Sequence, residues 1–81
     1  MSEKYVYELG IDVETKHKRK LITRLRSLKT TVMVEDGGEY REDRHISQVH
    51  IDTTWNESQL DDWLYRTKGI EYIGTFMRHV F

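Results

Sequence analysis

The 81-residue chain contains no cysteine and no proline, and its five glycines are isolated except for Gly37-Gly38. Without cysteine there is neither a disulfide framework nor a thiolate metal site, so the cross-links of small secreted domains are excluded. Without proline or a glycine-rich tract, nothing in the sequence reads as a linker or a low-complexity segment. We therefore expect a single domain over residues 1–81, located in the cytoplasm.

Long apolar runs are absent as well. No stretch approaches the roughly 20 apolar residues of a membrane span, and residues 1–4 lead into a strand-like segment rather than a signal peptide. Hydrophobic residues make up 37% of the chain and charged residues 33%, which is enough apolar material for a core. A chain of this length buries only about 60% of its unfolded surface. We expect a small soluble domain, with no membrane contact, that self-associates as a homodimer.

The net charge of −1 conceals a strong segregation of charge. Residues 16–29 carry seven lysines or arginines and no acid, whereas residues 35–62 carry nine acids and two arginines. A folded domain with one positive element and one negative stretch has a large dipole, which bears on association rather than on chemistry. The charge pattern therefore favours a binding protein.

The first half of the chain predicts a strand, a helix and a second strand. Residues 5–11 alternate apolar and polar side chains, which is the period of a strand with one buried face. Asp12 is suited to be an N-cap, and apolar residues recur at helical spacing from there to Lys29. Residues 30–35 are rich in β-branched side chains, and the Asp-Gly-Gly sequence at 36–38 predicts a hairpin turn.

The third strand is expected over residues 44–52. Val49 and Ile51 share one parity in this segment, whereas Ile46 has the other. Such a change of parity predicts either a bulge near residues 47–48 or a late start of the strand.

The second helix has a clear start, because Asn56 as N-cap and Gln59 three residues later form a capping box. The Lys-Gly pair at 68–69 ends this helix, and residues 70–80 alternate again as a fourth strand. The order β-α-β-β-α-β predicts an α+β ferredoxin-like plait, with two helices on one face of a four-stranded antiparallel sheet. The alternative is a β-α-β-β-β-like or swapped arrangement in which the apolar segment 70–81 pairs with a neighbouring chain.

The first helix is the leading candidate for a functional surface. On a helical wheel its leucines lie on one side and most of its cations on the other, so the cations point to solvent. Clustered cations bind phosphates, which favours a non-catalytic binding or regulatory module that contacts nucleic acid or a nucleoprotein. The candidate contact residues are Lys16, Arg19, Lys20, Arg24 and Arg26.

The acidic stretch supports a different hypothesis. A compact domain without catalytic motifs also fits a protein–protein inhibitor or adaptor of the kind that phages and mobile elements encode. It would act through an acidic loop and exposed aromatic side chains. The candidate residues are Glu39, Glu42, Asp43, Tyr72 and Phe76.

The face of the sheet opposite the helices raises the question of base stacking. Tyr72, Phe76 and Arg78 share one parity of the last strand, and with His50 they would form a surface of the kind that stacks single-stranded bases. The segment 44–51 nevertheless lacks the glycines and aromatics of the RNA-recognition motif. Core or dimer-interface packing therefore remains the simpler interpretation of these aromatics.

Catalytic signatures are absent from the sequence. There is no nucleophile elbow, no glycine-rich phosphate loop and no histidine spacing typical of zinc, so we expect no catalytic residue, no metal ligand and no cofactor. One enzymatic alternative is kept, which is a small metal-dependent nuclease. It requires Glu8 and Asp52 to meet on neighbouring strands.

Overall fold

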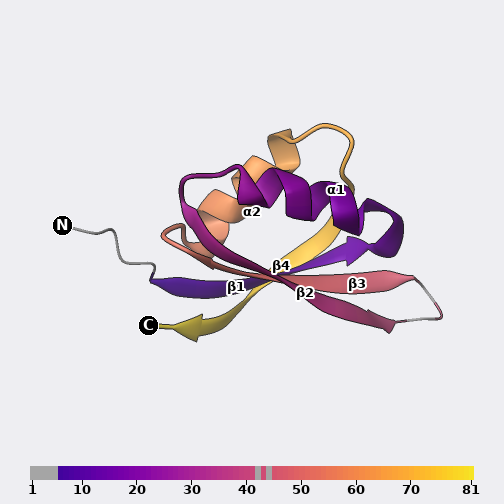
Figure 1. The fold of residues 1–81 in the computed structure, drawn as a ribbon, viewed down its shortest axis with the longest axis horizontal. Helices are drawn as coiled ribbons and strands as arrows, with labels where there is room; N and C mark the ends of the chain where they lie inside the picture. The colour runs from indigo at the N-terminus through magenta and orange to yellow at the C-terminus, as the bar shows by residue number, and fades with distance from the viewer. Residues whose placement is uncertain (1–5, 42, 44) are drawn as a thin grey trace.

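The computed structural model describes residues 6–41, 43 and 45–81. The four strands form one antiparallel sheet in the order β2-β3-β1-β4, and both helices lie on the same side of it (Figure 1). Neither described helix is long and apolar enough to cross a membrane. The elements are β1 (Tyr7–Glu14), α1 (Thr15–Arg26), β2 (Thr31–Arg41), β3 (Ile46–Thr53), α2 (Glu57–Arg66) and β4 (Tyr72–Val80).

This arrangement is an α+β fold compatible with the predicted ferredoxin-like plait. As the plait predicts, β4 pairs with β1 within the chain, from Tyr7 opposite Val80 to Val13 opposite Tyr72. The two central strands, β1 and β3, pair in regular register, with Glu8 opposite Asp52.

The core lies between the sheet and the two helices. β1 and β3 contribute alternate residues to it, while each helix contributes two leucines one turn apart, which is the spacing that puts side chains on one face. The buried hydrophobic residues are Leu9, Ile11, Val13, Leu21, Leu25, Val49, Ile51, Leu60, Leu64 and Ile70.

β1 is longer than its sequence predicts. Asp12 lies inside the strand, opposite Gln48 of β3 and Gly74 of β4, so its predicted role as the N-cap of α1 is wrong. Pairing on both sides extends the strand as far as Glu14, which is the N-cap but makes no side-chain capping bond. The backbone N–H of Thr15 instead donates to the carbonyl of His45, at 2.7 Å.

α1 also ends earlier than predicted. Its last residue is Arg26 rather than Lys29, because Ser27 turns back on the helix. The backbone N–H and the hydroxyl of Ser27 both donate to the carbonyl of Arg24, at 3.2 and 2.7 Å. A serine that satisfies a terminal carbonyl in this way competes with a further helical turn.

The sequence Asp36-Gly37-Gly38 is not the hairpin turn. β2 continues through it to Arg41, with register shifts between Asp36 and Gly38 and on either side of them. Gly38 has a φ of 85°, which is the left-handed conformation that a bulge needs as much as a turn does. The strand reversal follows Arg41 and precedes Ile46, and two residues of that segment, Glu42 and Arg44, lie outside the described residues.

Of the two explanations offered for the change of parity, the bulge near residues 47–48 is wrong, because the register shifts lie on β2 and β3 is regular against β1. The late strand start is right, because β3 begins at Ile46 rather than at residue 44. Ser47 and Thr53 of β3 are fully buried on the same face as Val49 and Ile51. The Ser47 hydroxyl lies 2.8 Å from that of Thr15. Ser47 therefore occupies a core position. Because it is polar, the alternation of apolar residues did not predict this.

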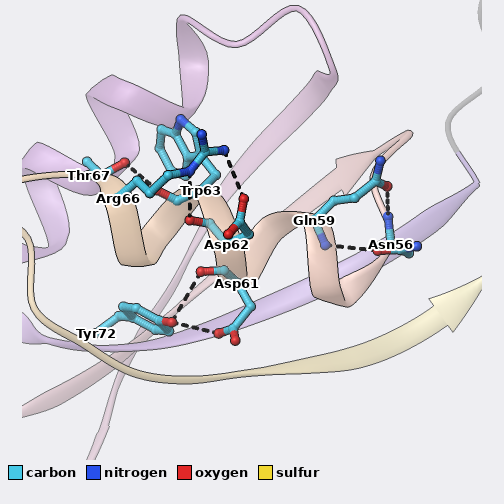
Figure 2. A network of polar contacts seen from close by, with 8 residues as sticks. All are labelled: Asn56, Gln59, Asp61, Asp62, Trp63, Arg66, Thr67 and Tyr72. Carbon is cyan, nitrogen blue, oxygen red and sulfur yellow. Dashed lines mark hydrogen bonds and ion pairs between the residues drawn. The ribbon is translucent and has the colours of Figure 1, made fainter.

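α2 begins as predicted. Figure 2 shows the capping box: the side chain of Asn56 accepts from the backbone N–H of Gln59 and the side chain of Gln59 accepts from that of Asn56, both at 2.9 Å. At the other end, the Thr67 hydroxyl donates to the carbonyl of Trp63 at 2.7 Å, one residue before the predicted Lys68-Gly69 stop.

Candidate functional site

The five cations singled out in the first helix all lie on α1 and are all exposed. At 100° per residue they occupy an arc of about 160° on a helix about 18 Å long. The buried Leu21 and Leu25 lie outside this arc. We call the cationic face of α1 the surface formed by Lys16, Arg19, Lys20, Arg24 and Arg26.

Most of the charge on this face is not neutralised within the described part of the chain. Lys16 Nζ lies 3.3 Å from a Glu14 oxygen, and Lys20 Nζ donates to the carbonyl of Gly69 at 3.5 Å. No described acid lies within ion-pair distance of the three arginines of the face, Arg19, Arg24 and Arg26. Their guanidinium groups therefore remain open to an external anion.

Lys18 belongs to α1 but not to its cationic face. The 100° step turns it toward the sheet, where its Nζ lies 3.1 Å from Asp36 Oδ2. A hydrogen bond from the backbone N–H of Gly38 and the ammonium of Lys18 together lower the pKa of Asp36 below its usual value. One acid of the negative stretch is thus already paired with the positive helix.

Glu39, a candidate of the acidic-loop hypothesis, lies on β2 rather than in a loop. Its Oε2 accepts from the hydroxyl of Thr15 at 2.6 Å and lies 3.7 Å from His45 Nδ1. Asp43 is exposed and takes part in an interaction of its own, while Glu42 lies outside the described residues. The two described acids of this set, Glu39 and Asp43, are therefore each engaged in an interaction.

The second surface is the side of the sheet that no described helix covers (Figure 1). Two aromatic rings lie on it, each above a glycine of the neighbouring strand. A Cβ on Gly10 would stand 2.2 Å from Phe76 Cζ, and a Cβ on Gly37 would stand 2.7 Å from His50 Cε1. The rings of His50 and Phe76 meet edge to face, with centroids 6.5 Å apart. The two glycines allow the rings to rest against the sheet.

Arg78 ties these groups together. Its Nη1 donates to Glu8 Oε2 at 2.8 Å and to His50 Nδ1 at 2.7 Å. An arginine only donates, so Nδ1 of His50 must accept, and its Nε2–H donates to Gln48 Oε1, 3.2 Å away. Burial, followed by the charge of Arg78, lowers the pKa of His50 below its usual value, which favours the neutral ring.

Carboxylates crowd the same surface. Asp52 lies directly opposite Glu8 on the neighbouring strand. Burial, followed by the charges of Glu8 and Glu35, raises the pKa of Asp52 above its usual value. We call the open face the surface formed by Glu8, Asp12, Glu35, His50, Asp52, Phe76 and Arg78.

The predicted grouping of β4 side chains is only partly right. Phe76 and Arg78 do lie near His50, but Tyr72 lies on the helix side and packs against the core. Its hydroxyl donates to Asp61 Oδ1 of α2 at 2.7 Å (Figure 2). Two register shifts between β1 and β4 change which side a given parity faces. Burial and the bond to Asp61 raise the pKa of Tyr72 to about 12.

One cluster of possible metal ligands was missed by the sequence analysis. Glu14, His17 and Glu71 place one ligand atom each within 4.8 Å of one another. An imidazole with two carboxylates suits a divalent cation such as Zn²⁺ or Mn²⁺. No spacing rule detects it, because the residues come from the end of β1, the first turn of α1 and the segment before β4. Lys16 pairs with Glu14 and so already neutralises part of the negative charge of this cluster.

Glu8 and Asp52 do meet, as the nuclease alternative requires, but Glu8 is held by Arg78. Among the described residues this pair is not part of a group whose ligand atoms converge. No protein family, no curated protein and no solved structure matches the chain. Function is therefore inferred from the two surfaces.

Proposed function

We propose that the protein is a non-catalytic, regulatory binding module with a ferredoxin-like plait, and that the cationic face of α1 contacts the phosphates of a nucleic acid or a nucleoprotein. One observation carries the proposal: all five cations of this face are exposed, and its three arginines face no described acid within ion-pair distance. Arginine is the side chain best suited to bidentate contact with phosphate.

The size of the face suits a phosphate backbone. Five cations along about 18 Å of helix have close to the spacing of the phosphates of one DNA strand, which carries one charge per about 3.4 Å of the helix axis. Neutralising five phosphates releases bound counterions, so the logarithm of the affinity should fall with the logarithm of salt concentration with a slope of about −4.5.

The two alternatives are less well supported by the contacts. For the inhibitor or adaptor, Asp36 and Glu39 of the acidic stretch are engaged by Lys18 and Thr15 and are not free for a partner. For the nuclease, Arg78 occupies the carboxylate of Glu8 that a catalytic metal would need.

The test is binding of a labelled DNA duplex, and of single-stranded DNA and RNA of the same sequence, measured by fluorescence anisotropy at several salt concentrations. Between about 50 and about 200 mM salt the native protein should lose roughly 500-fold in affinity for the duplex. Failure to bind any of these nucleic acids at the lower salt concentration would refute the proposal.

Charge reversal locates the surface. The double variant Arg19→Glu with Arg26→Glu should weaken binding at least tenfold and make the salt slope shallower by about 2. The matched control, Arg66→Glu with Lys68→Glu, changes net charge equally at exposed positions that are not part of the face, at the end of α2 and just after it. Equal loss in both variants would show that only net charge matters, and circular dichroism checks that both remain folded.

A further inference from the structure

Figure 1 shows α1 on one side of the sheet, and the open face is the other side of the sheet. The cationic face of α1 is turned away from the buried Leu21 and Leu25, and the two faces carry opposite charge. We propose that the open face of one copy binds the cationic face of α1 of another, so that copies associate head to tail. This interface does not require nucleic-acid binding to occur. It rests on the proposed function only in predicting that nucleic acid competes for the same arginines.

The first argument is the charge balance of the open face. Four carboxylates lie on it, Arg78 is the one lysine or arginine whose described side chain lies among them, and His79 stands opposite Glu8. Arg78 pairs with Glu8, while no described group donates to the carboxylates of Glu35 or Asp52. Asp12 Oδ1 is buried and has no hydrogen-bond partner among the described residues. The face thus lacks positive charge that a partner can supply.

The second argument is that the required positive charge exists on the same chain. On α1, no described acid neutralises Arg19, Arg24 or Arg26, as set out above. Arg78 already shows how a guanidinium binds this surface, because it contacts a carboxylate and the ring of His50 at once. An incoming arginine can also contact a carboxylate and a ring at once, by an ion pair with Asp52 and by a cation–π contact with the ring of Phe76.

The third argument is geometric. Phe76 and His50 rest above Gly10 and Gly37, so these two rings lie close to the backbone of the sheet. Residues Arg19 and Arg26 are two turns apart on α1, a rise of about 10.5 Å. Along β1 the carboxylates at positions 8 and 12 are about 13 Å apart, and neighbouring strands are about 4.8 Å apart. The spacings of the two charge arrays therefore agree within the reach of arginine side chains.

The symmetry of the association follows from the position of the two surfaces. Because they differ and face opposite ways, pairing them leaves one unused surface at each end, and the contact is heterologous. Such a contact adds further copies instead of closing a two-fold dimer. The expected homodimer and this head-to-tail association are thus separate outcomes of a hydrodynamic experiment.

The experiment is sedimentation velocity of the native protein over a range of concentrations. At about 50 mM salt its weight-average mass should rise with concentration beyond that of a dimer, and at about 500 mM salt it should return to a monomer because the charges are screened. A mass that stays monomeric up to about 1 mM protein at low salt, or a two-fold dimer insensitive to salt, would overturn the proposal.

Two double variants make the test specific. Arg19→Glu with Arg26→Glu removes the α1 surface, and Glu35→Gln with Asp52→Asn removes the open-face surface. Each should be monomeric alone, but an equimolar mixture should form a one-to-one complex and stop there, because only one intact pair of surfaces remains. Two variants that stay monomeric when mixed would contradict the head-to-tail contact.

A matched control neutralises two carboxylates elsewhere, Glu57→Gln with Asp62→Asn on α2, and should associate like the native protein. The open-face variant also separates the two proposals. It should be monomeric yet bind DNA at least as tightly as the native protein. If it is monomeric while no form of the protein binds nucleic acid, the proposed function fails and the self-association stands.

Discussion

Neighbouring residues of β2 show how differently the two faces of the sheet treat an acid. Asp36 faces the helices, where Lys18 and the backbone N–H of Gly38 hold its carboxylate and lower its pKa. Glu35 faces the other way, among the carboxylates of the open face, and raises the pKa of Asp52. Because side chains alternate along a strand, one of these two neighbouring acids meets a cation and the other does not.

The two faces also differ in what holds them together. The helix side contains the buried leucines and valines of the core, whereas the open face is held by two partly buried rings and the contacts of Arg78. Burial of apolar surface dominates folding energies, so the helix side should determine stability. The open face can then change with little cost, which is what a recognition surface allows.

The largest loss of stability is expected from a substitution on the helix side of the sheet. Leu25→Ala removes a fully buried side chain of α1 and should lower the free energy of unfolding by about 2–5 kcal/mol. Phe76→Ala, its counterpart on the open face, should cost less because that ring is only partly buried. Urea denaturation measures both. A larger loss for Phe76→Ala would mean that the open face carries the stability.

A smaller loss of stability is expected on the open face, at the point where a ring packs directly on the backbone. Gly10→Ala places a methyl group 2.2 Å from Phe76 Cζ and should cost about 1–3 kcal/mol, because the ring must move. In a Phe76→Ala background the same change should cost little. Additive losses in this double-mutant cycle would show that the ring does not rest on Gly10 in solution.

Local patterns were sufficient to predict much of this fold. The element order and the capping box at Asn56 depend on residues a few positions apart, and both agree with the structure. The same holds for part of the candidate site, because helical spacing alone predicts that Arg19 and Arg24 face solvent while Leu21 does not. The adjacency of Glu8 and Asp52 likewise follows from the expected pairing of their strands.

Errors arose where pairing between strands decides the outcome. Asp12 has the chemistry of an N-cap, but ladders on both sides keep it in β1. Gly38 has the left-handed conformation of a turn, yet β3 continues alongside and makes it a bulge. Tyr72 changed sides because of a register shift, and the cluster around His17 needs three distant segments. None of these contacts is encoded within a short window of sequence.

The comparison is sharpened by neutralising one acid on each face. On the helix side, Asp36→Asn removes an ion pair with Lys18 that is half exposed, so the loss should be no more than about 1 kcal/mol. The folded state lowers the pKa of Asp36, so its contribution is present above 3.8 and disappears as pH falls through the folded value. Unfolding free energies of the variant and the native protein should therefore converge in acid. Lys18→Met should cost a similar amount at neutral pH, and an unchanged stability in both would show that the pair contributes nothing.

The smallest effect, and the one of opposite sign, is expected from Asp52→Asn on the open face. Here the folded state raises the pKa, so the charged carboxylate destabilises the fold once pH exceeds 3.8. Removing it should stabilise the protein at pH 7 by about 0.5 kcal/mol, since a like-charged pair with Glu8 is relieved. The gain should vanish in acid, where the native aspartate is protonated in both states.

Thermal or urea unfolding of the native protein and the Asp52→Asn variant from neutral pH to about pH 3.5 measures this gain. The control is Glu57→Gln, which removes a carboxylate from the first turn of α2. It should not stabilise the protein, because a negative charge near the N-terminus of a helix is favourable. A loss of stability in Asp52→Asn at pH 7 would mean that the carboxylate already has a partner in the isolated protein. Neutralising an acid should thus stabilise the protein when the acid lies on the open face and destabilise it when the acid lies on the helix side. This difference is expected if the carboxylates of the open face lack a partner within the chain and bind a cationic partner instead.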